Sequence, residues 1–255
     1  MLPIKLSPLG KIISKKPTAR DYVQNGLIAM WDGVENAGLG VHDKNATVWK
    51  DLIGNNNLIA HGNIENKNGD NYIWLGDVYY TGESNNLINT ISNGNFTLEL
   101  VVHSNSAPYV ANANAIFVLC SSVDYNDFSQ RVCVISNTGQ SGYENNAFSA
   151  IQINESSWDG TRSAVRTGIG FNEDIVLEIT SANKNINYYK NTSLMHNIQF
   201  GPLTSYNKVG FAIGKYLQIM VEVDLKAYCI RVYSRTLSSD EISANYAIDK
   251  VRFNL

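Results

Sequence analysis

The sequence predicts an all-β protein in which two sheets pack face to face. Short stretches of alternating apolar and polar residues recur along most of the chain, as expected for strands with one buried face. Turns rich in glycine and asparagine separate these stretches, and helical periodicity is nearly absent before the C-terminus. With 255 residues, 44% of them hydrophobic, the chain is long enough to bury a full core. We therefore expect a single β-sandwich domain.

The first 20 residues differ from the rest of the chain. They include five basic residues and no acidic one, namely Lys5, Lys11, Lys15, Lys16 and Arg20, whereas the remainder is acidic overall. Neither strand nor helix periodicity is present, and lysine and proline interrupt every apolar run that a secretory signal would need. We expect residues 1–20 to be an extended basic anchoring arm that packs on a partner subunit, ahead of a sandwich domain of residues 21–255.

Strands and turns are expected from Gly26 onward. Asp32 and Asp51 follow two of the expected strand positions, and we interpret both as turn formers rather than ligands. The expected strands before the closing one are, in order, Leu27 to Trp31, Leu58 to His61, Tyr72 to Leu75, Val78 to Tyr80, Phe96 to His103, Ala115 to Ser121, Gln130 to Ser136, Phe148 to Asn154, Ala164 to Phe171, Ile175 to Thr180, Ile186 to Lys190 and Lys208 to Ile213.

The clearest strand and the clearest helix start lie near the C-terminus. Between Ile219 and Tyr233 the pattern places Val221, Val223, Leu225, Ala227, Cys229 and Val232 on one side, and the charged Glu222, Asp224, Lys226 and Arg231 on the other. This pattern predicts a strand with one solvated face. Ser238 and Glu241 have the spacing of a capping box, and Ile242 with Tyr246 predicts one apolar helical face.

Several segments together resemble laminin-G-like domains, which belong to the concanavalin A-like lectin and glucanase group. G-L-I-A-M-W-D (from Gly26) is similar to the opening strand of the family, and D-L-I-G-N-N-N (from Asp51) to its Asp-Ser-Gly-Asn turn. F-T-L-E-L-V-V (from Phe96) resembles a central strand, and I-N-Y-Y-K-N-T-S-L (from Ile186) a hairpin. V-Y-S-R-T-L-S-S-D-E-I-S-A-N-Y (from Val232) resembles the closing strand end and helix. The resemblance implies a jelly-roll sandwich with one short C-terminal helix.

The closing strand bears on catalysis. Glu222-x-Asp224 resembles the Glu-x-Asp-x-Glu strand of retaining glucanases with this fold, in which paired carboxylates act as nucleophile and acid/base. Position 226 is a lysine, so the third carboxylate is missing. We therefore expect that the chain is not an enzyme. The alternative is a carbohydrate-active enzyme, a glycoside hydrolase or lyase, on the same scaffold.

One loop has the ligand chemistry that calcium prefers. Asp124, Asn126 and Asp127 place three oxygen-bearing side chains within four residues, and laminin-G-like domains often hold calcium at a rim. We expect either a calcium site there or a turn built from ordinary turn residues. Cys120, Cys133 and Cys229 lie in apolar strand patterns, which predicts small core residues, with a bridge between Cys120 and Cys133 as the alternative.

Sugar recognition requires aromatic rings with polar groups beside them. Trp158 lies in a polar, glycine-containing loop where no apolar period would bury it, and Asp159 adjoins it. Tyr125 and Tyr143 lie in similarly polar loops. We predict that these four residues bind a glycan, with a packing role for Trp158 as the alternative. Trp31, Trp49 and Trp74 lie in strand patterns and are expected in the core.

The resemblance implies a function class. The family includes lectins, adhesion modules, glycosidases and virion proteins, and we expect a non-catalytic lectin-like protein of a bacteriophage virion: a capsid decoration, head fibre or tail component. The expected partners are other structural subunits bound through residues 1–20, further copies of the chain, and host or mucosal glycans. Assembly in the bacterial cytoplasm and display on the virion surface are expected, with the bacterial cell surface as the alternative. A net charge of −3 and the lack of a long apolar stretch argue against nucleic-acid binding and membrane insertion.

Overall fold

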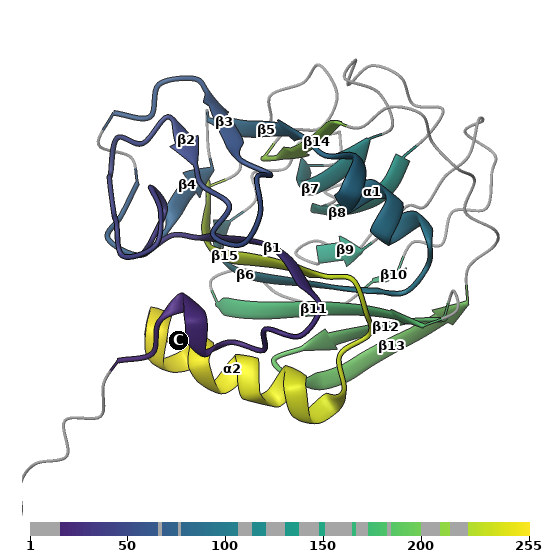
Figure 1. Ribbon diagram of the computed structural model, residues 1–255. Helices are drawn as coiled ribbons and strands as arrows, with labels where there is room; N and C mark the ends of the chain where they lie inside the picture. Colours follow the sequence, from purple (N-terminus) through teal and green to yellow (C-terminus); the bar gives the residue numbers. More distant parts are fainter. Residues whose placement is uncertain are drawn as a thin grey trace, which may run out of the picture.

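The computed structural model describes residues 16–65, 68–75, 78–106, 114–120, 131–137, 148–150, 165–166, 173–182, 185–199, 210–214 and 224–255. Two antiparallel sheets face each other, and a helix lies along the outer face of one of them (Figure 1). The predicted all-β sandwich is therefore confirmed. No helix in the described part of the chain is long and apolar enough to cross a membrane.

The seven-stranded sheet is built around the closing strand. Its order is β1 (Leu27–Asp32), β15 (Asp224–Tyr233), β6 (Phe96–Ser106), β11 (Asp174–Ala182), β12 (Asn185–Lys190) and β13 (Ser193–Gln199), with β4 (Ile73–Leu75) also paired to β15. The predicted hairpin at Ile186 is β12 and β13, joined at Asn191 and Thr192, both with positive φ. The pattern had not indicated β13 itself as a separate strand.

The eight-stranded sheet contains the shorter strands. Its order is β10 (Val165–Arg166), β9 (Phe148–Ala150), β8 (Arg131–Asn137), β7 (Asn114–Cys120), β14 (Gly210–Ile213), β5 (Tyr79–Glu83), β3 (Leu58–His61) and β2 (Val48–Trp49). Most of these strands fall where the alternation predicts them, and the expected continuations of β9 and β10 lie outside the described residues. The bridge between Cys120 and Cys133, the alternative to small core residues, would not join a directly opposed pair, because Cys120 lies opposite Arg131.

The main core lies between the two sheets. Trp31 and Trp49 are fully buried there, and Trp74 packs against the same cluster, as the sequence predicts. The inner face of β6 contributes Leu98, Leu100 and Val102, each opposite an apolar residue of β11 or β15. At about 25 cal/mol per Å² of apolar area buried, large side chains such as these supply most of the stabilisation of the fold.

The edge of β1 is closed by the predicted turn at Asp51. One carboxyl oxygen of Asp51 accepts the backbone N–H groups of Met30 and Ile53, and the other accepts both the backbone N–H and the side-chain amide of Asn56. With both oxygens used in this way, Asp51 is a turn former, as predicted. An edge strand that would otherwise expose free backbone groups is thereby covered.

A bulge in β15 corrects one sequence prediction. The register shifts between Ala227 and Cys229, so that Tyr228 and Cys229 both lie on the outer face. Ile230 and Val232 return to the inner core. The simple alternation placed Cys229 beside Ala227, which is wrong because one extra residue in a bulge reverses the facing of the residues beyond it.

Three helical segments accompany the sheets. α2 (Ser239–Phe253) begins at the predicted capping box of Ser238 and Glu241, and it is longer than expected. α1 (Asn85–Ser92) was not predicted, although Ser84 caps it and Leu87 and Ile91 are fully buried one turn apart. The third, η1 (Ala19–Asp21), belongs to the N-terminal segment. α2 and η1 together make a third layer over the seven-stranded sheet (Figure 1).

Candidate functional site

The outer face of the seven-stranded sheet carries a row of charged residues. The strand register places Glu178 of β11 opposite Glu99 of β6, and Glu99 opposite Arg231 of β15. All three side chains are buried, and Arg231 is 0% exposed. The sequence predicted a solvated charged face at Arg231, and this is wrong because α2 covers that half of the sheet.

Arg231 is the centre of this row. Its guanidinium forms a two-pronged pair with Asp249 of α2, with both N–O distances at 2.7 Å. Its Nε donates to Glu99 Oε2 at 2.6 Å, and the side-chain amide of Asn245 also donates to Glu99. Bidentate geometry and full desolvation make such bonds strong, and they require both carboxylates to remain in place.

The N-terminal segment enters the same network. We use this term for residues 17–23, which include η1. The hydroxyl of Tyr22 donates to Asp249 Oδ1 at 2.7 Å, and its ring lies 4.1 Å from the Arg231 guanidinium carbon. The backbone N–H of Val23 donates to Asn245 Oδ1 at 3.0 Å. Burial, followed by the neighbouring Asp249 carboxylate, raises the pKa of Tyr22 well above its usual value, so its hydroxyl stays a donor.

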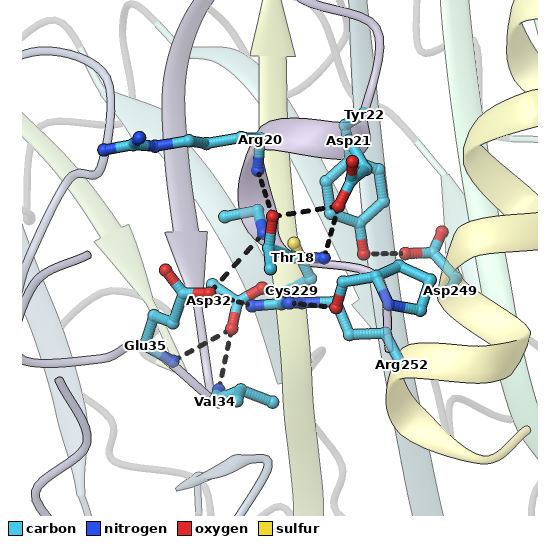
Figure 2. Close-up of polar contacts among 12 residues, drawn as sticks. Thr18, Arg20, Asp21, Tyr22, Asp32, Val34, Glu35, Cys229, Asp249 and Arg252 are labelled. Carbon is cyan, nitrogen blue, oxygen red and sulfur yellow. Dashed lines mark hydrogen bonds and ion pairs between the residues drawn. The ribbon is translucent and has the colours of Figure 1, made fainter. Parts of the chain in front are cut away.

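A second arginine connects the two ends of the chain. Arg252 donates from Nε to Asp32 Oδ2 at 2.9 Å, from Nη2 to Glu35 Oε1 at 2.8 Å, and from Nη1 to the carbonyl of Pro17 at 2.9 Å (Figure 2). Asp32 also accepts the backbone N–H groups of Val34 and Glu35, which confirms it as a turn former. These bonds hold the loop after β1 and the N-terminal segment against α2.

These contacts correct our expectation for the basic arm. We placed residues 1–20 on a partner subunit, yet Pro17 binds Arg252 of its own chain and Ala19 is buried against its own sandwich. The boundary after Arg20 therefore falls inside a docked segment. The prediction of partner binding is left with the residues that precede Lys16, which lie outside the described part of the chain.

Glu178 is the member of the row whose buried carboxyl group receives no hydrogen bond of normal geometry. It is 0% exposed. Burial raises the pKa of Glu178 well above its usual value, the negative charges of Glu99 and Asp249 raise it further, and Arg231 offsets only part of this. These surroundings favour the neutral form of Glu178 over the charged form.

The other half of the same face is partly exposed. His103 Nδ1 lies 2.8 Å from Asp174 Oδ1, with side chains 20% and 32% exposed, and the hydroxyl of Tyr228 donates to the same oxygen at 3.1 Å. The ammonium of Lys226 lies 5.2 Å from the centre of the Tyr72 ring. Burial, then Asp174, raises the pKa of Tyr228, so this hydroxyl is a hydrogen-bond donor and a poor nucleophile.

The residues predicted to bind a ligand lie outside the described residues. This holds for the predicted glycan contacts Trp158, Asp159, Tyr125 and Tyr143 and for the predicted calcium ligands Asp124, Asn126 and Asp127. Glu222 lies outside as well. Within the described residues, no group of three histidine, cysteine or acidic side chains is arranged to hold a metal. Both sites therefore stay predictions.

The strands that flank those loops show from which end of the eight-stranded sheet each loop leaves. Cys120 at the end of β7 pairs with Arg131 at the start of β8, and the chain between them carries Tyr125. β9 runs antiparallel to β8 and ends, at Ala150, toward that same end of the sheet, before the connection with Trp158. β8 ends at Asn137 on the opposite end, before the connection with Tyr143.

Sequence reasoning missed the residues that build the buried network. Tyr22, Asn245, Asp249 and Arg252 were not singled out. A signal was present, because Ile242, Asn245, Asp249 and Arg252 follow the spacing of one helical face. Polar residues on the face that also carries Ile242 indicate a helix that packs over charges.

No family model and no curated protein matches the chain. Among solved structures it is similar to Trypanosoma rangeli sialidase in complex with sialic acid, at 15% identity and a TM-score of 0.61, covering 93% of this chain and 34% of that one. It is also similar to the binding domain of botulinum neurotoxin DC in complex with rat synaptotagmin II, at 14% identity and a TM-score of 0.62, covering 87% and 51%.

The similarity to sialidases corrects our expectation about enzymatic activity. We expected that the chain is not an enzyme, and the likeness to sialidases overturns that exclusion. That expectation relied on the missing third carboxylate of the Glu-x-Asp-x-Glu pattern. Glycosidases with other catalytic groups, such as a tyrosine nucleophile, do not need this pattern. The chain spans about a third of the sialidase chain, and identity this low establishes the shared fold alone. What the chain shares with these proteins is an all-β sandwich.

Proposed function

We propose that this chain is a lectin-like recognition module of a larger assembly, and that it binds glycans through loops of the eight-stranded sheet. One observation carries the proposal. The N-terminal segment is fixed to α2 on the outer face of the seven-stranded sheet, whereas the strands joined by the loops with Trp158 and Tyr125 belong to the opposite sheet. A module attached through its N-terminus would therefore present these loops away from its attachment.

The similar structures support a recognition role. One of them is a sialidase in complex with sialic acid, and another is a neurotoxin binding domain in complex with rat synaptotagmin II. Loops on a rigid scaffold are where binding residues concentrate. We extend the proposal to the virion surface of a bacteriophage, with the residues before Lys16 bound to other subunits and calcium held by Asp124, Asn126 and Asp127. These finer assignments rest on the resemblance of the sequence.

A glycan array with the full chain tests the recognition role, with sialylated glycans as the first class. Trp158→Ala is expected to weaken binding roughly ten- to hundredfold, because a stacked aromatic ring contributes about 1–3 kcal/mol. Its melting temperature should stay unchanged. Tyr246→Ala is the matched control, since this aromatic residue lies on α2, over the opposite sheet, and its loss should leave glycan binding unchanged. Release of sugar from a sialoside, measured on the same samples, would replace recognition by hydrolysis as the function.

Unchanged binding with a lower melting temperature in Trp158→Ala would identify the tryptophan as a packing residue. If the folded protein bound no glycan on the array, the proposal would be contradicted.

A further inference from the structure

The N-terminal segment docks as a peptide would dock in a receptor site. Ala19 and Tyr22 are each 2% exposed. The Tyr22 ring is held against the Arg231 guanidinium and its hydroxyl binds Asp249, while Val23 binds Asn245. Apart from Arg231, these partners lie on α2, more than 200 positions away along the chain. We call this receptor site the Tyr22 pocket, formed by Arg231, Asn245 and Asp249.

The segment is held by side chains rather than by a sheet. Among the described residues, its own backbone–backbone hydrogen bond runs from Asp21 to Thr18, inside the segment. Its bonds to α2 and to the loop after β1 run to the side chains of Asn245, Asp249, Arg252 and Glu35. Removing the segment would therefore break no strand pairing among the described residues.

A short reversal joins the segment to β1. Leu27 N–H donates to the carbonyl of Gln24, and Gly26 has a φ of 81°, which a residue with a side chain rarely adopts. Ser234 donates its N–H to Gly26, and Arg235 donates from Nε to the carbonyl of Asn25. The body thus fixes the reversal at residues 24–26, and the segment folds back from this point onto α2.

We propose that the Tyr22 pocket also accepts the N-terminal segment of a second copy of this chain, so that copies join by exchanging their segments. This rests on the proposed role in an assembly. The exchanged segment would make the same bonds as the resident one, with the partner's tyrosine between Arg231 and Asp249, and no new complementary surface is required. The two arrangements are docking within one copy and exchange between copies. The three-residue reversal favours docking within one copy, because it gives the resident segment a high effective concentration.

Shortening the reversal tests the proposal. Deletion of residues 24–26 from the full chain removes the reversal by which the segment folds back onto its own α2, so exchange predicts that the segment docks on another copy. We expect a doubling of the mass in native mass spectrometry and light scattering. The matched control adds Tyr22→Ala to the same deletion, which removes the side chain that fills the pocket, and should be monomeric. A monomeric deletion variant, or a control that remains dimeric, would overturn the proposal.

A second measurement applies if the deletion prevents folding. The complete chain is unfolded and refolded at about millimolar concentration, which is comparable with the effective concentration of a short connection. We expect a dimer that is absent when Tyr22→Ala is refolded in the same way, and equal amounts of dimer in both would contradict exchange. Glycan binding by a protein that stays monomeric would support the proposed function and contradict exchange. An exchanged dimer that binds no glycan would support exchange and contradict the proposed function.

Discussion

The two halves of the outer face of the seven-stranded sheet carry similar residues in very different surroundings. Under α2, the covered half has Glu178, Glu99 and Arg231 in one row, and all are buried. In the open half, Asp174, His103 and Lys226 form a corresponding row, because the register pairs His103 with both of the others. The same three strands supply both rows.

The difference shows what a helix does to charges on a sheet. In the covered half, water is replaced by groups of α2 and the N-terminal segment, so each unpaired charge is costly. In the open half, water and salt screen the pairs, and their contribution to stability should be small. Substitutions on the covered face, at the start of α2 and in the open half should therefore differ widely in their effect on stability.

Arg231→Met should destabilise the fold by about 3–5 kcal/mol, because it leaves Glu99 and Asp249 buried without their cation. Denaturant unfolding, together with hydrogen exchange of α2, measures the loss. The matched control replaces Glu99 and Asp249 by leucine as well, and it should recover much of the stability because no unpaired charge is then left. A loss below about 1 kcal/mol in the single variant would disprove the importance of the covered row.

Glu178→Gln should make the fold more stable than wild type at neutral pH. The folded pKa of Glu178 is raised, so the native state holds a proton that the unfolded chain releases above about pH 4.5. The stabilisation by this group is therefore complete below that pH and is lost as the pH rises toward the folded pKa. The difference in unfolding free energy between variant and wild type, measured from pH 4 to 9, should increase in the variant's favour, by at most about 1.4 kcal/mol per pH unit. A difference independent of pH would show that Glu178 is ionised in the fold.

Glu241→Gln should weaken the start of α2 by about 1 kcal/mol. Glu241 pairs with Arg235 through both oxygens and accepts the N–H of Ser238, and the bonds from Arg235 lower the pKa of Glu241 to about 2. This stabilisation is present above about pH 4.5 and is lost as the pH falls toward 2. Because the pair is partly exposed, added salt should reduce the effect. Thermal unfolding at pH 3 and pH 7 measures it, and equal losses at both would contradict the ion pair.

Asp174→Asn should change stability by less than about 1 kcal/mol, although it removes the charged partner of His103. Denaturant unfolding at low and high salt checks this prediction. A loss as large as that of Arg231→Met would show that the open half is as thoroughly desolvated as the covered half, and the contrast between the two would fail.

Local patterns in the sequence determined much of the fold. Alternation located most of the strands, β2 and β13 excepted, because side chains of a strand point to opposite faces in turn. The capping box at Ser238 and Glu241 located the start of α2, because the bonds involved span only three residues. The turns at Asp32 and Asp51 could be assigned from the tendency of aspartate to bind nearby backbone N–H groups.

Tertiary structure alone decided which polar residues are buried. Arg231 on its strand is indistinguishable by pattern from a solvated residue, and only the packing of α2 brings Asp249 and Tyr22 to it. The bulge at Tyr228 and Cys229 likewise depends on pairing with β6, since a strand alone carries no information about an extra residue. The candidate glycan loops could be selected by composition, whereas the ends of the sheet from which they leave follow from strand order. Contacts between residues more than 200 positions apart depend on the whole fold, and no local pattern contains them.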